Sequence, residues 1–175
     1  MEAGYTLRRL GEDDAHAYKA LRLEALLDRP EAFASSWEDE QAHELPWFAA
    51  RLRDGFVAGA FDAQGALVGS AGLLVPASPK LRHKGVLWGM YVSPRARGTG
   101  VAPALVQAVL DEALGRVEGV RLTVTVGNDA ALRLYRRLGF EEYAREPQAL
   151  KVGERYHDEI LMARAVAGDA RPAVA

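Results

Sequence analysis

The sequence predicts a mixed α+β fold, with a central sheet of about six to seven strands and helices on both of its faces. Segments with strand and helix patterns follow one another as strand, two helices, three strands, helix, strand, helix and two strands. Two neighbouring strands that are joined by a helix need a crossover connection, and the right-handed crossover rule predicts that such strands are parallel. A short turn between two other strands predicts an antiparallel hairpin, so the sheet is expected to be mixed.

The N-terminal part is expected to begin with a strand and a helix. Residues 5–10 have the composition of a strand. The acidic run 12–14 suits the first turn of a helix, because the positive end of the helix dipole favours negative side chains there. This helix is expected to run to about Leu27 and to end at Arg29-Pro30, since proline cannot continue it.

A second helical stretch follows after a short connection. Ser35 and Glu38 have the spacing of a capping box, in which each side chain satisfies a main-chain amide of the first turn. Pro46 interrupts this stretch, which then continues to about Asp54. The sequence therefore predicts a broken helical region between the first helix and the hairpin.

The middle of the chain is expected to hold three strands, a helix and a fourth strand. Residues 56–62 and 67–75 flank a glycine-containing turn, which predicts an antiparallel hairpin. Residues 86–92 form the next predicted strand, and residues 103–114 form a helix. Residues 120–126 alternate strictly between apolar and polar side chains, so they predict a strand with one buried face.

The last helix and two strands complete the predicted domain. Asn128 is a good N-cap residue, and apolar side chains recur after it at helical spacing, at Ala131, Leu134, Tyr135 and Leu138. Residues 140–149 and 155–163 predict the final two strands. We expect a single domain over residues 1–165, followed by a frayed tail over residues 166–175.

The most informative segment lies between the strand 86–92 and the helix 103–114, and reads Arg97-Gly98-Thr99-Gly100-Val101-Ala102. A strand, a glycine-rich turn and a helix N-terminus together bind anions, because main-chain amides point at the ligand and the helix dipole favours negative charge. Glycine also lets a ligand approach the main chain closely. The segment therefore predicts a cofactor that carries phosphate.

Phosphate-binding loops differ in the residues that they require. A Walker loop needs Lys and then Ser or Thr directly after its last glycine, and no such pair follows Gly100. A dinucleotide-binding loop needs a third glycine where this chain has Pro103. The third alternative is the pattern Gln/Arg-x-x-Gly-x-Gly/Ala, which Arg97, Gly100 and Ala102 match in register. An ordinary strand-to-helix turn also explains glycines that are followed by proline.

Two motifs together resemble those of the GNAT superfamily of N-acetyltransferases. The pattern Arg97-x-x-Gly100-x-Ala102 is similar to the pyrophosphate loop of that family, and Tyr91-Val92-Ser93-Pro94 precedes it as in many members. The run from Asn128 through Tyr135 to Leu138-Gly139-Phe140 resembles the second family signature, at the expected distance from the first. The resemblance extends from about Thr6 to Met162.

The resemblance implies a GNAT-like fold, in which the strands 86–92 and 120–126 are parallel neighbours that splay apart and admit acetyl-CoA. It implies that the main chain at Met90, Tyr91 and Val92 binds the pantetheine arm. The pyrophosphate is expected at the main-chain amides of Arg97, Gly98, Thr99, Gly100, Val101 and Ala102, with the Arg97 side chain adding charge. Asn128 matches a family residue that contacts the cofactor arm, although a plain N-cap explains it equally well.

The resemblance also implies an acyltransferase that passes the acetyl group directly to a primary amine in a ternary complex. Tyr135 matches the general acid of the family, and a core aromatic residue is the alternative interpretation. Many members carry Glu on the strand before the loop, where this chain has Trp88-Gly89, so a base from that strand is not expected. Glu40 and Glu38 are candidates for the base or for acceptor binding, and a solvated acidic helix start is the alternative for each.

Composition excludes several other classes of site. The 175 residues, of which 49% are hydrophobic, suffice for one sizeable core, and the net charge of −2 argues against a general affinity for nucleic acids. The absence of cysteine excludes disulfides, thiolate metal ligands and a cysteine nucleophile. The histidines have no metal-site spacing, and the lack of a leader or of a long apolar run predicts a cytoplasmic protein with no membrane partner.

The sequence leaves the acceptor and the exact role of the fold open. The acceptor is expected to be a small-molecule amine or a peptide amine, and an acidic patch near it would suit polyamines, aminoglycosides or a basic peptide end. A homodimer is compatible with the family. One alternative is a non-catalytic acyl-CoA-binding or regulatory module that has lost its base. Another is a nucleotide-binding oxidoreductase, which Pro103 disfavours.

Overall fold

The computed structural model describes residues 4–166 and contains a mixed sheet of seven strands in the order β1-β2-β3-β4-β5-β7-β6. The strands are β1 Tyr5–Arg9, β2 Phe56–Asp62, β3 Leu67–Leu74, β4 Lys84–Val92, β5 Gly119–Thr125, β6 Glu141–Val152 and β7 Arg155–Ala165. All neighbouring strands are antiparallel except β4 and β5, which are parallel. The predicted fold class is confirmed.

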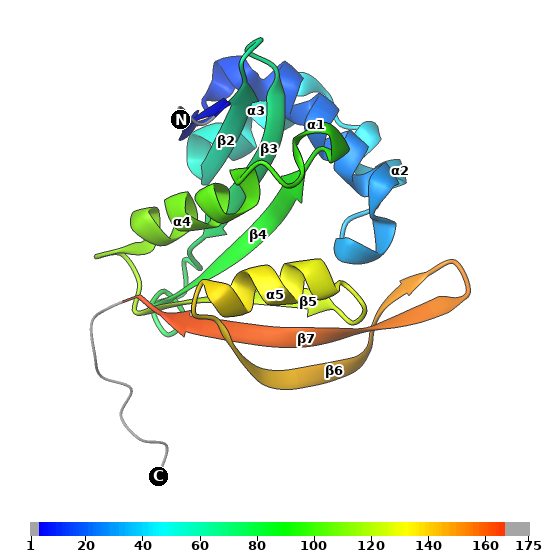
Figure 1. The fold of residues 1–175 in the computed structure, drawn as a ribbon, viewed down its shortest axis with the longest axis vertical. Coiled ribbons are helices and arrows are strands. Elements are labelled where there is room, and N and C mark those ends of the chain that lie inside the picture. The colour runs from blue at the N-terminus through cyan, green and yellow to red at the C-terminus, as the bar shows by residue number, and fades with distance from the viewer. Residues whose placement is uncertain (1–3, 167–175) are drawn as a thin grey trace.

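Within residues 4–166, five α-helices cover the two faces of this sheet (Figure 1). They are α1 Ala15–Asp28, α2 Trp37–Gln41, α3 Leu45–Asp54, α4 Val101–Ala113 and α5 Asp129–Arg137, with single 3₁₀ turns at Glu12–Asp14, Pro30–Ala32 and Pro94–Ala96. The helices α4 and α5 share one hydrophobic core with the sheet, and α1 and α3 share a second one. The apolar face that each segment shows in the sequence is therefore the face that it buries.

The helical region after α1 differs from the prediction in one detail. Ser36, rather than Ser35, is the N-cap of α2, and its hydroxyl accepts a hydrogen bond from the Asp39 amide at 3.2 Å. The spacing of three residues is thus kept but shifted by one position. Pro46 lies in the first turn of α3, where a missing amide hydrogen costs nothing, and this explains why the stretch is broken into two helices.

The strands β4 and β5 diverge after a short paired segment. Only Lys84, Gly85 and Val86 of β4 have partners on β5, opposite Gly119–Arg121. From there β4 continues to Val92, and Figure 1 shows it rising away from β5 toward α1. The predicted splay is confirmed, and it leaves main-chain N–H and C=O groups along both strands without a partner strand, which is unfavourable unless a ligand or water binds them.

The long hairpin of β6 and β7 forms one edge of the sheet. The register of the two strands shifts between Glu146 and Leu150, where Gln148 has a positive φ of 53°. Such a bulge, together with Pro147, disturbs the outer row of main-chain groups and makes the edge a poor template for another strand. Among the residues described, no helix is long and apolar enough to cross a membrane. The tail predicted for residues 166–175 lies almost wholly outside the described residues.

Candidate active site

A cleft of about 1010 Å³ opens where β4 and β5 diverge. Its walls are the second half of β4, the face of β5 that bears Thr123 and Thr125, one side of α5 along its length and the segment 32–35 between α1 and α2. The loop that follows β4 closes one end of the cleft. The structure therefore brings both sequence motifs to one cavity.

The loop between β4 and α4 has the main-chain conformation of an anion site. Gly98 and Gly100 have φ values of +77° and +89°, which residues other than glycine rarely adopt. Gly100 is the N-cap of α4. Within residues 4–166, the amides of residues 98–102 donate to no acceptor. The Thr99 hydroxyl donates to the Ala96 carbonyl at 2.6 Å and fixes the turn. Free amides at a helix N-terminus attract phosphate.

The side chain of Arg97 is held against the protein and does not project freely from the loop. Its Nε donates to the Val92 carbonyl oxygen at 3.1 Å, and its Nη2 is bonded to the carboxylate of Asp28 on α1. This hydrogen bond lowers the pKa of Asp28. Asp28 thus balances part of the positive charge that the sequence suggested at the rim of the loop.

The end of β4 presents main-chain groups to the cleft. The Ser93 amide donates to Val68 of β3 at 2.8 Å. Successive residues of a strand direct these groups to opposite edges, so Tyr91 also faces β3, whereas Met90 and Val92 face the gap. The Tyr91 side chain is buried against α1, and its hydroxyl lies within hydrogen-bond distance of the carboxylates of Glu24 and Asp28.

A bulge precedes these residues in β4. Trp88 pairs with Gly72 of β3 and Tyr91 pairs with Ser70, so two residues of β4 lie opposite one residue of β3. Gly89 lies in the bulge with a φ of +61°. Trp88-Gly89 stands where many family members have an acidic residue. At this place β4 therefore has a glycine bulge, and it contributes no carboxylate to the cleft.

Two side chains of the second motif lie at the cleft. Asn128 caps α5, since its side-chain oxygen accepts a hydrogen bond from the Ala131 amide at 3.3 Å, and it also lines the cavity. Tyr135 is only 5% exposed and packs edge-on against Phe140, with ring centroids 5.7 Å apart. Burial raises the pKa of Tyr135 well above its ordinary value. Its hydroxyl has no hydrogen-bond partner among the described residues, although the residue lines the cleft.

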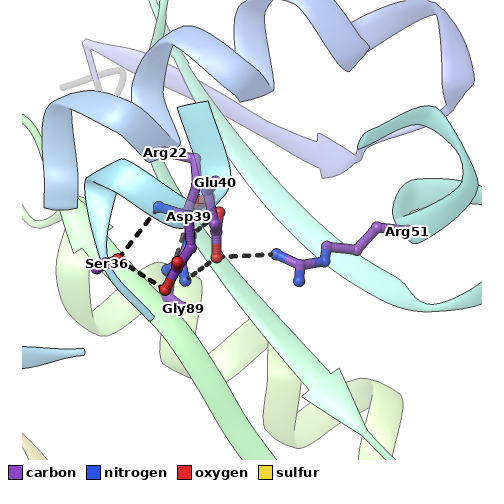
Figure 2. Close-up of polar contacts among 7 residues, drawn as sticks. Arg22, Ser36, Asp39, Glu40, Arg51 and Gly89 are labelled. Carbon is purple, nitrogen blue, oxygen red and sulfur yellow. Dashed lines mark hydrogen bonds and ion pairs between the residues drawn. The ribbon is translucent and has the colours of Figure 1, made fainter. Parts of the chain in front are cut away.

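The two acidic candidates of the second helical stretch have different surroundings. Glu38 is exposed and lies outside the cleft lining. Glu40 is 3% exposed and accepts two hydrogen bonds from Arg22, at 2.9 Å from Nε and 2.8 Å from Nη2 (Figure 2). Burial raises the pKa of Glu40, but the hydrogen bonds and charge of Arg22 and the charge of Arg51 outweigh it, so the pKa lies below its usual range.

The ion pair of Glu40 leads to a prediction about stability. Glu40→Ala leaves two guanidinium groups without their carboxylate, and loss of one partner of a buried pair costs about 3–5 kcal/mol. We expect a fall of that size in the free energy of unfolding, measured by urea denaturation at neutral pH. Glu38→Ala, two residues away and on the surface, is the matched control and is expected to change it by less than about 0.5 kcal/mol. Equal effects of the two substitutions would contradict a structural role for the buried pair.

One carboxylate at the cleft was missed by the motif analysis. Glu159 of β7 lies opposite Thr125 of β5, lines the cavity and bonds to the Thr123 hydroxyl at 3.3 Å. Burial raises the pKa of Glu159, the Thr123 hydroxyl opposes this shift, and the charge of Glu146 on β6 adds to it. The sequence signal was weak, because an acidic residue in an edge hairpin is usually solvated.

The comparison with protein families decides the assignment. The model of the Acetyltransferase (GNAT) family matches residues 20–140 of the chain. The chain belongs to the GNAT family. This match confirms the resemblance inferred from the loop and from the second motif, and it spans both walls of the cleft up to Phe140, whereas Glu159 lies beyond it.

Curated relatives and solved structures agree with the GNAT assignment. A mycothiol acetyltransferase of Salinispora tropica is 36% identical over 81% of this chain and 46% of its own length. An L-methionine sulfoximine/L-methionine sulfone acetyltransferase of Pseudomonas paraeruginosa is 34% identical over 66% of each chain. A GNAT phosphinothricin acetyltransferase of Sinorhizobium meliloti, solved with acetyl-CoA, has a TM-score of 0.78 at 23% identity and covers 93% of this chain and 88% of its own. The chain spans about half the length of the mycothiol acetyltransferases that it matches.

Proposed function

We propose that this chain transfers the acetyl group of acetyl-CoA to a primary amine by direct attack in a ternary complex. The observation that carries the proposal is the cleft between the splayed strands, with unpaired amides of residues 98–102 at one end. These amides bind the pyrophosphate of the donor, as a helix N-terminus favours. The family supports the same donor, and a relative's structure contains acetyl-CoA.

The main chain of β4 positions the reacting group. Met90 and Val92 bind the pantetheine arm through groups that face the gap, in the way that a neighbouring strand would. The N–H group of Val92 faces the cleft and polarises the thioester carbonyl. The carbonyl oxygen of Val92 accepts a hydrogen bond from Arg97, so only the N–H group of this residue is free for the donor. Asn128 lies where it can contact the same arm while it caps α5. Since the chain has no cysteine, an acetyl-cysteine intermediate is excluded, and the proposed route passes the acetyl group straight to the amine.

Two side chains transfer protons in the proposed reaction, one as a general acid and one as a general base. Tyr135 is protonated at neutral pH, as an ordinary tyrosine also is, and the rise of its pKa on burial keeps it so; it gives this proton to the departing CoA thiolate. An alkylammonium acceptor must lose a proton before it can attack, and Glu159 accepts that proton from the opposite wall of the cleft. We assign the base role to Glu159 instead of Glu40 or Glu38. Both oxygens of the Glu40 carboxylate already accept hydrogen bonds from Arg22, and Glu38 lies outside the cleft lining.

The acceptor is a small molecule that carries an amine. Relatives named for mycothiol and for L-methionine sulfoximine support this class. A cytoplasmic location and a homodimer stay predictions from the sequence.

Release of free thiol from acetyl-CoA tests the proposed function. Purified protein is expected to bind CoA in a calorimetric titration and to release thiol only when a primary amine is added. Mass spectrometry of the protein during turnover should show no acetylated intermediate. Binding of CoA without release of thiol by any amine would instead support the non-catalytic acyl-CoA-binding module, which the absence of an acid at Trp88-Gly89 allows.

A further inference from the structure

Three charged side chains from three different helices meet beside the cleft. Arg22 of α1 makes the bidentate pair with Glu40 of α2, and Arg51 of α3 approaches the same carboxylate, with Nη1 at 3.5 Å from Oε1 (Figure 2). The side chains of Arg22 and Glu40 are 7% and 4% exposed, and that of Arg51 is 27% exposed. We name Arg22, Glu40 and Arg51 the arginine cluster.

The arginine cluster carries an excess positive charge in a poorly solvated place. Two guanidinium groups share one carboxylate, so one positive charge has no partner within the cluster. Nη1 of Arg51 is buried and donates no hydrogen bond within the described part of the chain. The guanidinium of Arg51 lies 4.1 Å from the ring centre of Trp47 and 5.2 Å from that of Trp88. Aromatic rings stabilise a cation only partly, so an anion bound nearby is favourable.

Neighbouring charges do not cancel this excess. Asp39 keeps its negative charge, because the Ser36 hydroxyl that donates to it at 2.7 Å is neutral, but the residue is exposed and solvent screens its charge. Lys19, one turn before Arg22 on α1, adds a further positive charge, and its amine donates to the His43 carbonyl at 2.6 Å. Arg22, Arg51 and Lys19 therefore offset the acidic segment 38–40, whose two exposed carboxylates lie outside the cleft lining.

One edge of Arg22 remains available to a ligand. The pair with Glu40 uses Nε and Nη2, and Nη1 donates to no acceptor within residues 4–166. Nη1 lies 3.9 Å from the point that a Cβ atom on Gly89 would occupy, and both residues line the cleft. The glycine in the bulge thus leaves the approach to the guanidinium open.

We propose that the arginine cluster binds a carboxylate of the acceptor, so that the acceptor is an α-amino acid or a close analogue. The inference rests on the proposed function and adds the class of substrate to it. Arg22 on one wall of the cleft fixes the carboxylate, while Glu159 on the other wall faces the amine. This placement of opposite charges fits a zwitterion and rejects a polyamine, whose second ammonium would lie beside the cluster.

Matched acceptor pairs test the substrate class. The pairs are L-methionine with 3-(methylthio)propylamine and L-phenylalanine with phenethylamine, and spermidine is added as a polyamine. We expect kcat/KM to be about ten- to a hundredfold higher for the amino acid of each pair, because a charge-assisted hydrogen bond is lost with the carboxylate. Equal rates within both pairs, or faster turnover of spermidine, would overturn the proposal.

Two substitutions connect this preference with the arginine cluster. Arg51→Met removes the excess charge and leaves the pair of Arg22 and Glu40 intact, and Arg22→Lys removes the open edge while it keeps a cation beside Glu40. Both are expected to lower the ratio of the two rates about tenfold or more, chiefly through KM for the amino acid. Arg8→Lys is the control, because Arg8 makes a similar bidentate pair with Asp14 on the surface. An unchanged ratio in Arg51→Met and in Arg22→Lys would refute the role of the cluster.

A binding measurement separates this proposal from the proposed function. In the presence of CoA, L-methionine is expected to raise the melting temperature of the wild-type protein, and 3-(methylthio)propylamine at the same concentration is not. The effect of L-methionine should disappear in Arg51→Met. If no amine releases thiol but this difference is seen, the proposed function fails and the carboxylate site stands. If thiol is released but no difference is seen in either assay, the carboxylate site fails alone.

Discussion

Tyr135→Phe is expected to lower kcat by about 10²- to 10⁴-fold while the affinity for CoA stays unchanged. The substitution removes one hydroxyl group, which is the proton source for the departing thiolate in the proposed reaction. It should not disturb the fold, because this hydroxyl makes no hydrogen bond to the described residues and the ring keeps its contact with Phe140. Thiol release gives kcat, and calorimetric titration with CoA gives the affinity.

A tyrosine on the same cleft without an assigned role provides the control. Tyr143 of β6 also lines the cavity but is 51% exposed. Tyr143→Phe is expected to leave kcat essentially as it is. If Tyr135→Phe behaves like Tyr143→Phe, the buried tyrosine is a core residue, and the proton must come from water.

Glu159→Gln is expected to reduce kcat/KM by about 10²- to 10⁴-fold and to remove the acid limb of its pH profile. Only the deprotonated carboxyl can accept a proton, so in the wild-type enzyme kcat/KM rises as the pH increases through the pKa of Glu159. Burial raises that pKa, which places the limb above the usual range of a glutamate. The measurement is kcat/KM for one amine acceptor across the pH range in which the protein stays folded.

A second substitution, at Glu146, tests in which direction the acid limb of the pH profile moves. Glu146 of β6 pairs with Glu159 in the hairpin, and its negative charge raises the pKa of Glu159. Glu146→Gln removes this charge, so the acid limb is expected to move to lower pH without loss of the maximal rate. A limb that stays in place, or one that survives in Glu159→Gln, would assign the base to another group.

The parts of the site that depend on local sequence could be predicted. The turn at Gly98 and Gly100 needs positive φ values, and Asn128 caps a helix with a clear apolar periodicity, so the residues themselves reveal these features. The crossover rule predicted that the strands on both sides of α4 are parallel, and the family resemblance implied that the cofactor cleft lies between them. The family motifs then supplied the ligand.

The parts that depend on distant contacts could not be predicted. Glu40 looks like a member of a solvated acidic segment until α1 and α3 bring Arg22 and Arg51 to it, from 18 residues before and 11 residues after in the sequence. Glu159 becomes a cleft residue only because β7 inserts between β5 and β6. No pattern within either segment encodes these partners, since they follow from the tertiary packing.

The short pairing of β4 with β5 has a consequence for the folded chain as a whole. Only three pairs of residues hold the two halves of the sheet together along their shared edge. A ligand that fills the remaining gap acts as a missing strand, and it binds the native state but not the unfolded one. By mass action it adds about 2.7 kcal/mol to the free energy of unfolding at a concentration one hundred times its Kd. If the proposed donor fills this gap, it is part of the architecture, and we expect the resistance of this protein to unfolding and proteolysis to rise with the concentration of that donor.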